Sequence, residues 1–562
     1  MIPPRPFRPS RPSRPTRPTL LRLLAAATTL LISGCSADSL GEPVASSAVA
    51  PLGVVLDAEA AADTTGVYVA DSGFRPDIDG FAFENYTTGD GIVDLRPSDL
   101  HALFGDAVCA VGTGPDCRLS SPAVTWMDQL NAAMGGGHCE GFAVLSQIFL
   151  AELESPRRYG APITYELDPT TDAELYPAIA RWFATQAAEP SNSARRLDLT
   201  PVEVVAELRA TLGRPRTPEN TYTIAIFQPG YEAGHAVTPY AIEDRGDGIT
   251  WILIYDNNHP GVPRAIEVDT VADTWTYEAA INPEDDSTRY EGDASTSTLA
   301  ITPISARLAA QDCPFCAGEL DEELAARNQL SLTGPGARLA GTDFHVRDSS
   351  GRVHGRRGGE FVADIDGAGV LPLLTRLDDA PAPLLDLPAS LGVDVTVGAG
   401  DEAARDMSFA LVGAGYDVLI DGIDLPAGAA DTIHLSEDGT RVSYTSHTTS
   451  TPTIEVTTGN EDGYSYDLRV RASDLDRAGR VTVASPEDTA DVYVGAVHGG
   501  RFVLELVRLA PDGTETPATS AHVRVPAGQM LLLPLEEWTS SSPLAATVLD
   551  EDGQPARSVT FR

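Results

Sequence analysis

The protein has 562 residues, of which 39 are basic and 81 are acidic, and its formal net charge is −42. Every basic residue is an arginine, so the chain lacks the lysine that Schiff-base chemistry, Ser-Lys dyads and phosphate-binding GxxxxGKS/T loops require. The negative charge argues against nucleic acid as a partner, because binding a polyanion depends on a dense cationic surface.

The N-terminal segment has the features of an export signal. Arginine-rich sequence precedes an apolar run that is too short to span a membrane and that ends in Ile-Ser-Gly-Cys at residues 32–35. This ending resembles the lipobox of bacterial lipoproteins. The resemblance implies cleavage before Cys35, diacylation of its thiol, and anchoring to a bacterial lipid bilayer, facing the periplasm or the cell surface. We expect residues 1–34 to be the signal peptide and residues 35–65 to be a flexible tether.

The six cysteines fall into four groups. They are Cys35, Cys109, Cys117, Cys139, Cys313 and Cys316. The first is assigned to lipid. The second and third flank a glycine-rich turn, so a local disulfide is expected in an oxidising compartment. The last two form a CxxC motif without the second cysteine or histidine pair of a zinc site, so we expect a disulfide there and no metal. Only Cys139 is left without a partner.

A glycine-rich loop leads to Cys139. Three glycines and His138 precede it, and an almost wholly apolar stretch runs on to Leu153. A helix that is hydrophobic on all sides must be buried. At its N-terminus the helix dipole and the free amide groups would favour the thiolate of Cys139 and could receive an oxyanion. The alternative is that Cys139 is a small buried residue without chemistry.

A predicted hairpin further along the chain supplies a base and a carboxylate. Residues 234–243 alternate as a strand, residues 244–248 form a turn, and residues 249–255 form a second strand. Pairing of the two strands brings Asp256, at the end of the second, beside His235 in the first. Cysteine on a helix, histidine on a strand and a carboxylate one strand over are what nucleophilic cysteine catalysis needs.

These segments resemble the papain-like cysteine peptidases, which keep the order Cys, His, Asn or Asp along the chain. The use of aspartate is most similar to the bacteriocin-processing branch. The resemblance implies a papain-like domain over residues 66–310. It also implies Cys139 as the nucleophile, His235 as the base and acid, Asp256 as the orienting group, and a thiolate–imidazolium ion pair at rest.

Two roles in this site stay open. In papain-like enzymes an oxyanion glutamine shortly precedes the cysteine, where this chain has alanine and methionine. Gln129 or Asn131 could serve from a longer loop, or backbone amides could form the oxyanion site alone. Asn257 and Asn258 are alternatives to Asp256 for orienting the histidine.

Between the cysteine and the histidine we expect a helical insertion that lines one wall of a cleft. Helical spacing covers residues 172–186. Thr200 and Glu203 form a capping box with Pro201 at the first helical position, and this second helix should end at Gly213.

The C-terminal part has a different pattern. Short runs rich in Val, Thr, Ile and Leu alternate with Asp-Gly and other glycine-rich turns, which is typical of β-sandwiches. We expect a CxxC-containing connector at residues 311–330, a β-rich domain at residues 331–433 and a β-sandwich domain at residues 434–562. The fold class is therefore α+β, with a papain-like domain followed by an all-β, immunoglobulin-like region.

The sequence thus predicts an exported, lipid-anchored cysteine peptidase or amidohydrolase-like protein that needs no cofactor. Its substrate would be a protein, a peptide or another amide, attacked by acyl transfer. Two alternatives stay open: a non-catalytic binding or adhesion lipoprotein with a papain-like shell, and a transglutaminase-like acyltransferase. Transglutaminase-like proteins share the residue order but usually place the histidine closer to the cysteine than this chain does.

Overall fold

The structure is a computed structural model that describes residues 66–562 apart from several short segments. The segments not described are residues 90, 232, 280–288, 317–326, 335–340, 376–381, 438, 449–451, 460–462, 474–478, 487–488, 539–541 and 562. The predicted signal peptide, Cys35 and the tether lie outside the described residues. Among the residues that the structure describes, no helix is both long enough and apolar enough to cross a membrane.

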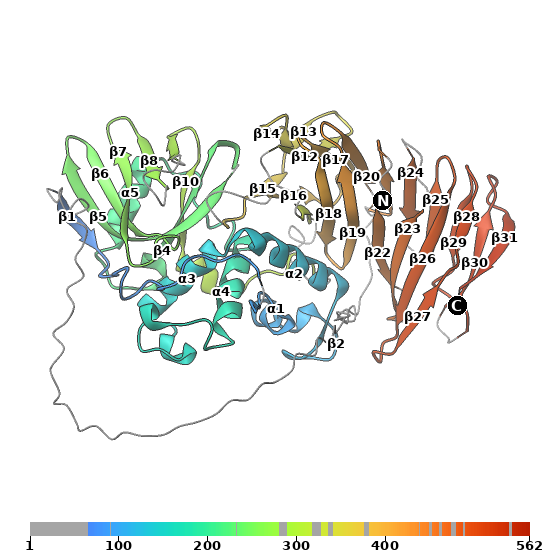
Figure 1. The fold of residues 1–562 in the computed structure, drawn as a ribbon, viewed down its shortest axis with the longest axis horizontal. Helices are drawn as coiled ribbons and strands as arrows, with labels where there is room; N and C mark the ends of the chain where they lie inside the picture. The colour runs from blue at the N-terminus through green and yellow to red at the C-terminus, as the bar shows by residue number, and fades with distance from the viewer. Residues whose placement is uncertain are drawn as a thin grey trace, which may run out of the picture. The chain divides into compact units, whose positions relative to one another are not determined.

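The first region, up to residue 308, combines helices with an antiparallel sheet of eight strands (Figure 1). The strand order is β10-β4-β5-β6-β7-β8-β9, and β1 also pairs with β5. The strands are β1 (Val67–Asp71), β4 (Tyr222–Phe227), β5 (Gly234–Gly246), β6 (Ile249–Tyr255), β7 (Pro263–Asp269), β8 (Thr274–Glu278), β9 (Arg289–Asp293) and β10 (Leu299–Pro303). A separate ribbon pairs β2 (Cys109–Val111) with β3 (Arg118–Leu119).

The helices of this region are short. They are α1 (Pro97–Phe104), α2 (Ser121–Ala133), α3 (Cys139–Leu150), α4 (Leu175–Ala184), α5 (Pro201–Thr211) and α6 (Ile304–Leu308). α5 begins as predicted, because the Thr200 hydroxyl accepts from Glu203 N (3.4 Å) while the Glu203 carboxylate accepts from Thr200 N (2.9 Å). It ends at Thr211, slightly before Gly213.

Helices α3 and α5 cover opposite faces of the sheet. Successive residues of a strand point to opposite faces, so the core that each residue joins shows which helix covers its face. Ala225 and Ala236 pack in one cluster with Cys139 of α3. Ile224 and Val237, their neighbours on β4 and β5, belong to a different core that includes residues of α5. All twelve residues of α3 are buried, as its hydrophobic sequence predicts.

The second region contains two large antiparallel sheets (Figure 1). One contains, in order, β15 (Gly369–Leu371), β16 (Leu384–Pro388), β11 (Arg327–Thr333), β18 (Ala404–Gly413), β19 (Tyr416–Leu425), β22 (Thr453–Gly459), β23 (Ser465–Ala472), β26 (Gly500–Leu509) and β27 (Glu515–Thr519), with β28 (Val523–Val525) beside β26. The other contains, in order, β14 (Glu360–Ala363), β13 (Val353–Arg357), β12 (Thr342–Asp348), β17 (Val393–Ala399), β20 (Ala430–Leu435), β21 (Arg441–Thr445), β24 (Arg480–Ala484), β25 (Val492–Ala496), β29 (Met530–Leu533), β30 (Ala545–Leu549) and β31 (Pro555–Thr560).

Apolar side chains of both sheets form one core, as in a sandwich; Phe344 of β12 and Phe409 of β18, for example, have ring centroids 6.5 Å apart. The expected division near residue 433 is not a sheet boundary. β20 pairs with β17 on one side and with β21 on the other, so the sheet continues across this position. The glycine-containing stretch at residues 436–440 therefore connects two paired strands of one sheet.

The two regions are joined by polar contacts and by a shared core. Trp126 of α2 donates its indole N–H to Gln329 Oε1 of β11 (3.1 Å), and the Thr125 hydroxyl donates to Asp417 Oδ2 of β19 (2.8 Å). Both predicted disulfides are confirmed: Cys109 is bonded to Cys117, and Cys313 to Cys316.

Candidate active site

Cys139 is the first residue of α3 and is fully buried. It is the only free cysteine among the described residues. The preceding Gly137 has φ +129°, and a Cβ there would lie 2.5 Å from the carbonyl oxygen of Thr375. Glycine is therefore required at this position both by the backbone conformation and by the close approach of another segment.

The β5–β6 hairpin forms as predicted and pairs His235 with Asp256. The two side chains are fully buried, and His235 Nε2 lies 2.7 Å from Asp256 Oδ1. The hydroxyl of Tyr277, on β8, donates to the other carboxylate oxygen. Burial alone would raise the pKa of the Asp256 carboxyl, but the charge and hydrogen bond of His235, together with Tyr277, hold that pKa well below its usual range.

Cys139 lies against the same strand. Its Sγ accepts a hydrogen bond from the backbone N–H of Ala236 (3.2 Å), the residue after His235. Asn257 fixes this contact, because its Nδ2 donates to the carbonyl oxygens of Cys139 (3.2 Å) and Ala236 (2.9 Å). The other ring nitrogen of His235, Nδ1, is buried and has no hydrogen-bond partner in the described part of the chain. The three residues expected to form the triad are thus brought together.

Asn257 and Asn258 do not take the orienting position. Asn257 connects the helix to the strand, and Asn258 contributes its backbone N–H to Asp256 Oδ1 (2.9 Å). Asp256 alone of these three contacts the His235 ring with its side chain.

The thiol differs from the sequence expectation of a resting thiolate. Burial raises the pKa of Cys139 well above its usual value, and the hydrogen bond from Ala236 offsets only part of this effect. Removing a thiolate from water costs more free energy than one backbone hydrogen bond and a helix N-terminus supply in stabilisation. Burial therefore favours the neutral thiol of Cys139 in this arrangement, which is the opposite tendency to the thiolate expected from the sequence.

A short segment of the second region covers the thiol. Leu374 packs in the apolar cluster that contains Cys139, Ala236 and Phe227. The following Thr375 is fully buried. This contact explains why no part of Cys139 reaches solvent.

Two hydrogen-bond donors converge on the carbonyl oxygen of Thr375. They are Asn85 Nδ2 (3.0 Å) and the backbone N–H of Cys139 (3.4 Å). Asn85 Oδ1 accepts from His138 N (2.7 Å), which fixes the orientation of the amide and leaves Nδ2 to donate. Such a pair of donors next to a nucleophile can stabilise an oxyanion.

Neither Gln129 nor Asn131 is one of the two donors to the Thr375 carbonyl oxygen. Asn131 exchanges two hydrogen bonds with the backbone of Leu95. Gln129 is buried on α2, and its Nε2 has no partner among the described residues. Both lie before the cysteine in the chain, but the side chain that donates to the Thr375 carbonyl oxygen is that of Asn85. The aromatic-rich sequence around Asn85 was the one available sign that this segment packs on the core, and it does not indicate that Asn85 lies close to Cys139.

Other site residues carry no sequence motif. Arg195 and Gln186 contact the covering segment, and Tyr277 reaches Asp256 from β8. Glu140, next to the cysteine, forms a fully buried ion pair with Arg307 of α6. Each is an ordinary residue in an ordinary local pattern, and only the tertiary structure brings it to Cys139.

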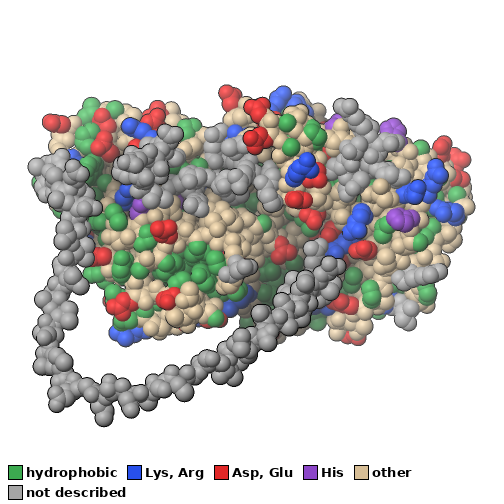
Figure 2. Space-filling model, viewed as in Figure 1, with side chains coloured by type: hydrophobic (Ala, Val, Ile, Leu, Met, Phe, Trp, Pro, Cys, Tyr) green, Lys and Arg blue, Asp and Glu red, His purple; other side chains and the backbone are tan. Residues whose placement is uncertain are grey.

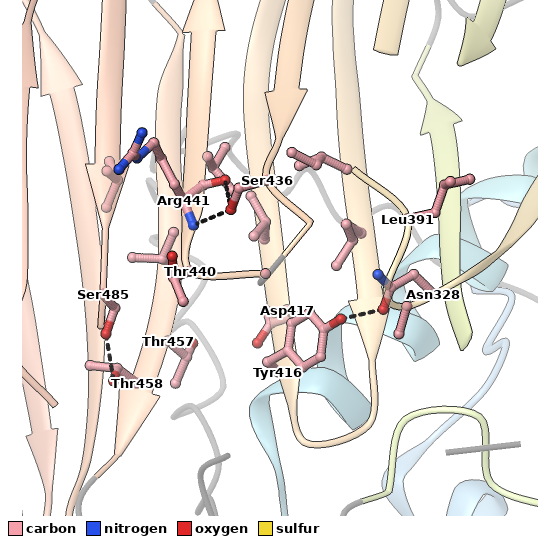
Figure 3. A pocket seen from close by; sticks show the side chains of 18 residues that line it. Asn328, Leu391, Tyr416, Asp417, Ser436, Thr440, Arg441, Thr457, Thr458 and Ser485 are labelled. Carbon is pink, nitrogen blue, oxygen red and sulfur yellow. Dashed lines mark hydrogen bonds between the residues drawn. The ribbon is translucent and has the colours of Figure 1, made fainter. Parts of the chain in front are cut away.

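A separate apolar pocket lies between the strands of the second region (Figure 3). Its polar groups are engaged with one another: the Tyr416 hydroxyl donates to Asn328, and Thr458 contacts Ser485. The residues that line it include no histidine or cysteine. Chemistry therefore points to Cys139 rather than to this pocket.

Comparison of the chain with protein-family models, with curated proteins and with solved structures found no match.

Proposed function

We propose that the protein is a cysteine peptidase or amidohydrolase that transfers the acyl group of an amide to Cys139. The observation that carries this proposal is the position of the thiol. The sulfur accepts a hydrogen bond from the backbone N–H of Ala236, next to His235. His235 is paired through Nε2 with Asp256, and its Nδ1 has no hydrogen-bond partner among the described residues.

In the proposed reaction, His235 Nδ1 takes the proton of the Cys139 thiol, and the sulfur attacks the carbonyl carbon of the substrate amide. Asp256 keeps the imidazole oriented and stabilises its charged form. Asn85 and the Cys139 amide donate to the oxygen as it becomes negative. His235 then protonates the departing amine, and water hydrolyses the thioester.

We also propose that the protein is exported and held at a bacterial membrane by lipid on Cys35. The lipobox-like sequence supports this, and the two disulfides are compatible with an oxidising compartment. Acidic side chains are spread over the visible face of the protein, with arginines among them, which favours neutral or basic protein and peptide substrates over nucleic acid (Figure 2). Release of a Cys35→Ala protein in soluble form would support the anchor, and unchanged membrane retention would contradict it.

The test of the catalytic proposal uses the full chain with Cys35→Ala and Leu374→Glu. The new carboxylate cannot remain in the apolar cluster, so the covering segment is displaced and the thiol is opened. We expect iodoacetamide at about pH 6 to alkylate Cys139 far faster than an ordinary cysteine, and His235→Ala to remove the excess. Leu374→Gly is the second opening variant, without a buried charge.

The same opened protein is incubated with casein peptides, and new peptide ends are identified by mass spectrometry. Ends that form with the opened protein and not with its Cys139→Ser counterpart support amide hydrolysis. Incorporation of a primary amine into the peptides would instead indicate a transglutaminase-like reaction. Ordinary alkylation together with no new ends, in both opening variants, would leave a non-catalytic binding protein.

A further inference from the structure

Residues 372–374 lie in the candidate active site and are held there through their backbone. The carbonyl oxygen of Pro372 accepts from Arg195 Nη1 (3.0 Å), and the N–H of Leu374 donates to Gln186 Oε1 (2.7 Å). Both binding side chains are at least nine-tenths buried. Such contacts recognise a main chain rather than a particular side chain.

Arg195 has the character of a binding group. Its Nε and Nη2 have no hydrogen-bond partner in the described part of the chain. Burial lowers the pKa of its guanidinium to about 10, so it remains protonated at neutral pH. A buried cation with unused donors is costly unless it serves to hold a ligand, and here the ligand is the Pro372 carbonyl.

Leu374 anchors this peptide. Its side chain is 1% exposed and packs with Phe227, Ala236 and Cys139. Gly234 leaves the room for it, because a Cβ at that position would lie 3.2 Å from a Leu374 methyl carbon. The cluster is apolar, so it is an apolar subsite next to the thiol.

Thr375 then places its carbonyl group at the oxyanion donors. Its N–H donates to the carbonyl oxygen of Gly234 (3.3 Å), beside His235. Its own carbonyl oxygen accepts from Asn85 Nδ2 and from the backbone N–H of Cys139. The carbonyl is thus polarised by two donors, one of which belongs to the nucleophile itself, as expected for a bond positioned for attack.

We propose that the peptide bond after Thr375 is a substrate of Cys139, so that the protein cleaves its own chain between Thr375 and Arg376. This inference rests on the proposed function. The Cys139 sulfur forms a bond to the Thr375 carbonyl carbon while its proton passes to His235. The C–N bond to Arg376 breaks, and His235 gives the proton to that nitrogen, which becomes a new amino terminus. Water then hydrolyses the thioester, which yields the Thr375 carboxylate and restores the thiol.

Cleavage at this position would nick the protein without separating its parts. The bond lies between β15 and β16, which pair with each other, and β16 also pairs with β11. Both new ends therefore belong to chains that remain held in one sheet. Release of the new Leu374–Thr375 end from the apolar cluster would then uncover the thiol and open the site to other substrates.

The test follows the full-length protein after expression, by intact mass and by sequencing of amino termini. We expect a fragment beginning at Arg376 on denaturing gels and a single species in native size-exclusion chromatography. Cys139→Ser should remain one intact chain, and Asn85→Leu should slow the cleavage by about 100-fold or more. Mixing Cys139→Ser protein with the unmutated protein should leave the variant intact if the bond is cut within its own molecule.

Two controls separate this inference from the proposed function. The Leu374→Glu protein should lose self-cleavage while it hydrolyses the probe peptide Pro-Leu-Leu-Thr carrying a fluorogenic amine. If the opened protein hydrolyses this peptide but the unmutated chain stays intact, the segment is only a cover and the inference is wrong. Cleavage at another bond would also overturn it. If the opened variants show neither hydrolysis nor rapid alkylation, the proposed function itself fails.

Discussion

Two buried aspartates, one in each region, each accept a hydrogen bond from a tyrosine hydroxyl, but their pKa values are shifted in opposite directions. Asp256 accepts the hydroxyl of Tyr277 and the imidazole of His235, and its pKa is held far below the usual value. Asp431, in the sandwich, accepts the hydroxyl of Tyr444 and the backbone N–H of His447 (2.7 Å). Burial is the largest influence on Asp431 and raises the pKa of its carboxyl.

The difference shows what an imidazole adds to a carboxylate–phenol pair. At Asp431 the phenol and the backbone amide offset only part of the effect of burial on the pKa, whereas at Asp256 the His235 ring and Tyr277 together outweigh that effect. The first region also holds most of the buried polar atoms that lack partners among the described residues, such as those of Arg195 and Gln186. Unused polar capacity is concentrated where chemistry is proposed, as expected for a binding site.

The largest effect is expected from Asp256→Asn. Because the amide favours the wrong tautomer of His235, the opened Leu374→Glu protein should lose on the order of 10⁴ in peptide hydrolysis rate while it stays folded. Asp431→Asn is the matched control in the sandwich and should leave the rate unchanged. A comparable loss from both substitutions would mean that Asp256 acts through stability alone. The rates are measured with the fluorogenic peptide, and folding is followed by circular dichroism.

Arg307→Met should destabilise the protein by about 3–5 kcal/mol, because it leaves the Glu140 carboxylate buried without its charge partner. The matched control is Arg469→Met, which breaks the pair with Glu455 in the sandwich, where the arginine is 31% exposed and the loss should be smaller. Denaturant unfolding measures both. Restoration of stability by adding Glu140→Gln to Arg307→Met would identify the unpaired charge as the cause.

Asn85→Leu should reduce peptide hydrolysis by about 10²–10³, since it removes one of the two oxyanion donors. Asn328→Leu in the sandwich breaks the contact with the Tyr416 hydroxyl and should change only stability. An unchanged catalytic rate constant in the Asn85 variant, measured at saturating peptide, would remove this residue from the oxyanion site.

Tyr277→Phe and Tyr444→Phe test the two carboxylate–phenol contacts directly. The lowered pKa of Asp256 favours its charged form more strongly than the raised pKa of Asp431 does. Loss of a hydrogen bond to a charged group costs about 1.5–3 kcal/mol, against about 0.5–1.5 kcal/mol for a neutral group. We therefore expect Tyr277→Phe to be the more damaging substitution in urea unfolding. The opposite order would contradict the assignment of the charged carboxylate to Asp256.

The pH dependence of unfolding should show the smallest contrast. Asp256 has a lowered pKa in the folded protein, so its stabilisation is present above the unfolded value of about 3.9 and is lost as the pH falls through the folded value. Asp431 has a raised pKa, so its contribution is present below about pH 3.9 and is lost as the pH rises through its folded value. Asp256→Asn should therefore weaken the acid-induced loss of stability, and Asp431→Asn should strengthen it.

Local patterns in the sequence were enough to predict the parts of the site that depend on neighbours in the chain. The helix that begins at Cys139 and the hairpin that pairs His235 with Asp256 follow from hydrophobic periodicity and a short turn. Asn85 was missed because it meets Thr375 from 290 residues away. The covering of the thiol was missed for the same reason, since the segment that excludes water from Cys139 is distant in the chain.

In the sandwich, the alternation of apolar residues predicted strands but not which strands pair. The turn after residue 435 looks the same in sequence whether it joins two domains or two strands of one sheet. Pairing of β17 with β20 across the intervening β18–β19 hairpin depends on contacts that no local pattern contains.

The core shared by the two regions makes the whole described chain one folding unit. Trp126 and Phe183 of the first region pack in the same cluster as Leu371, Leu384 and Val412 of the second. A protein shortened to its first 310 residues would keep the proposed triad but would expose this apolar wall to water. The sandwich thus supplies part of the apolar surface behind the proposed site, and a protein cut back to the first region should be less stable and more prone to aggregate.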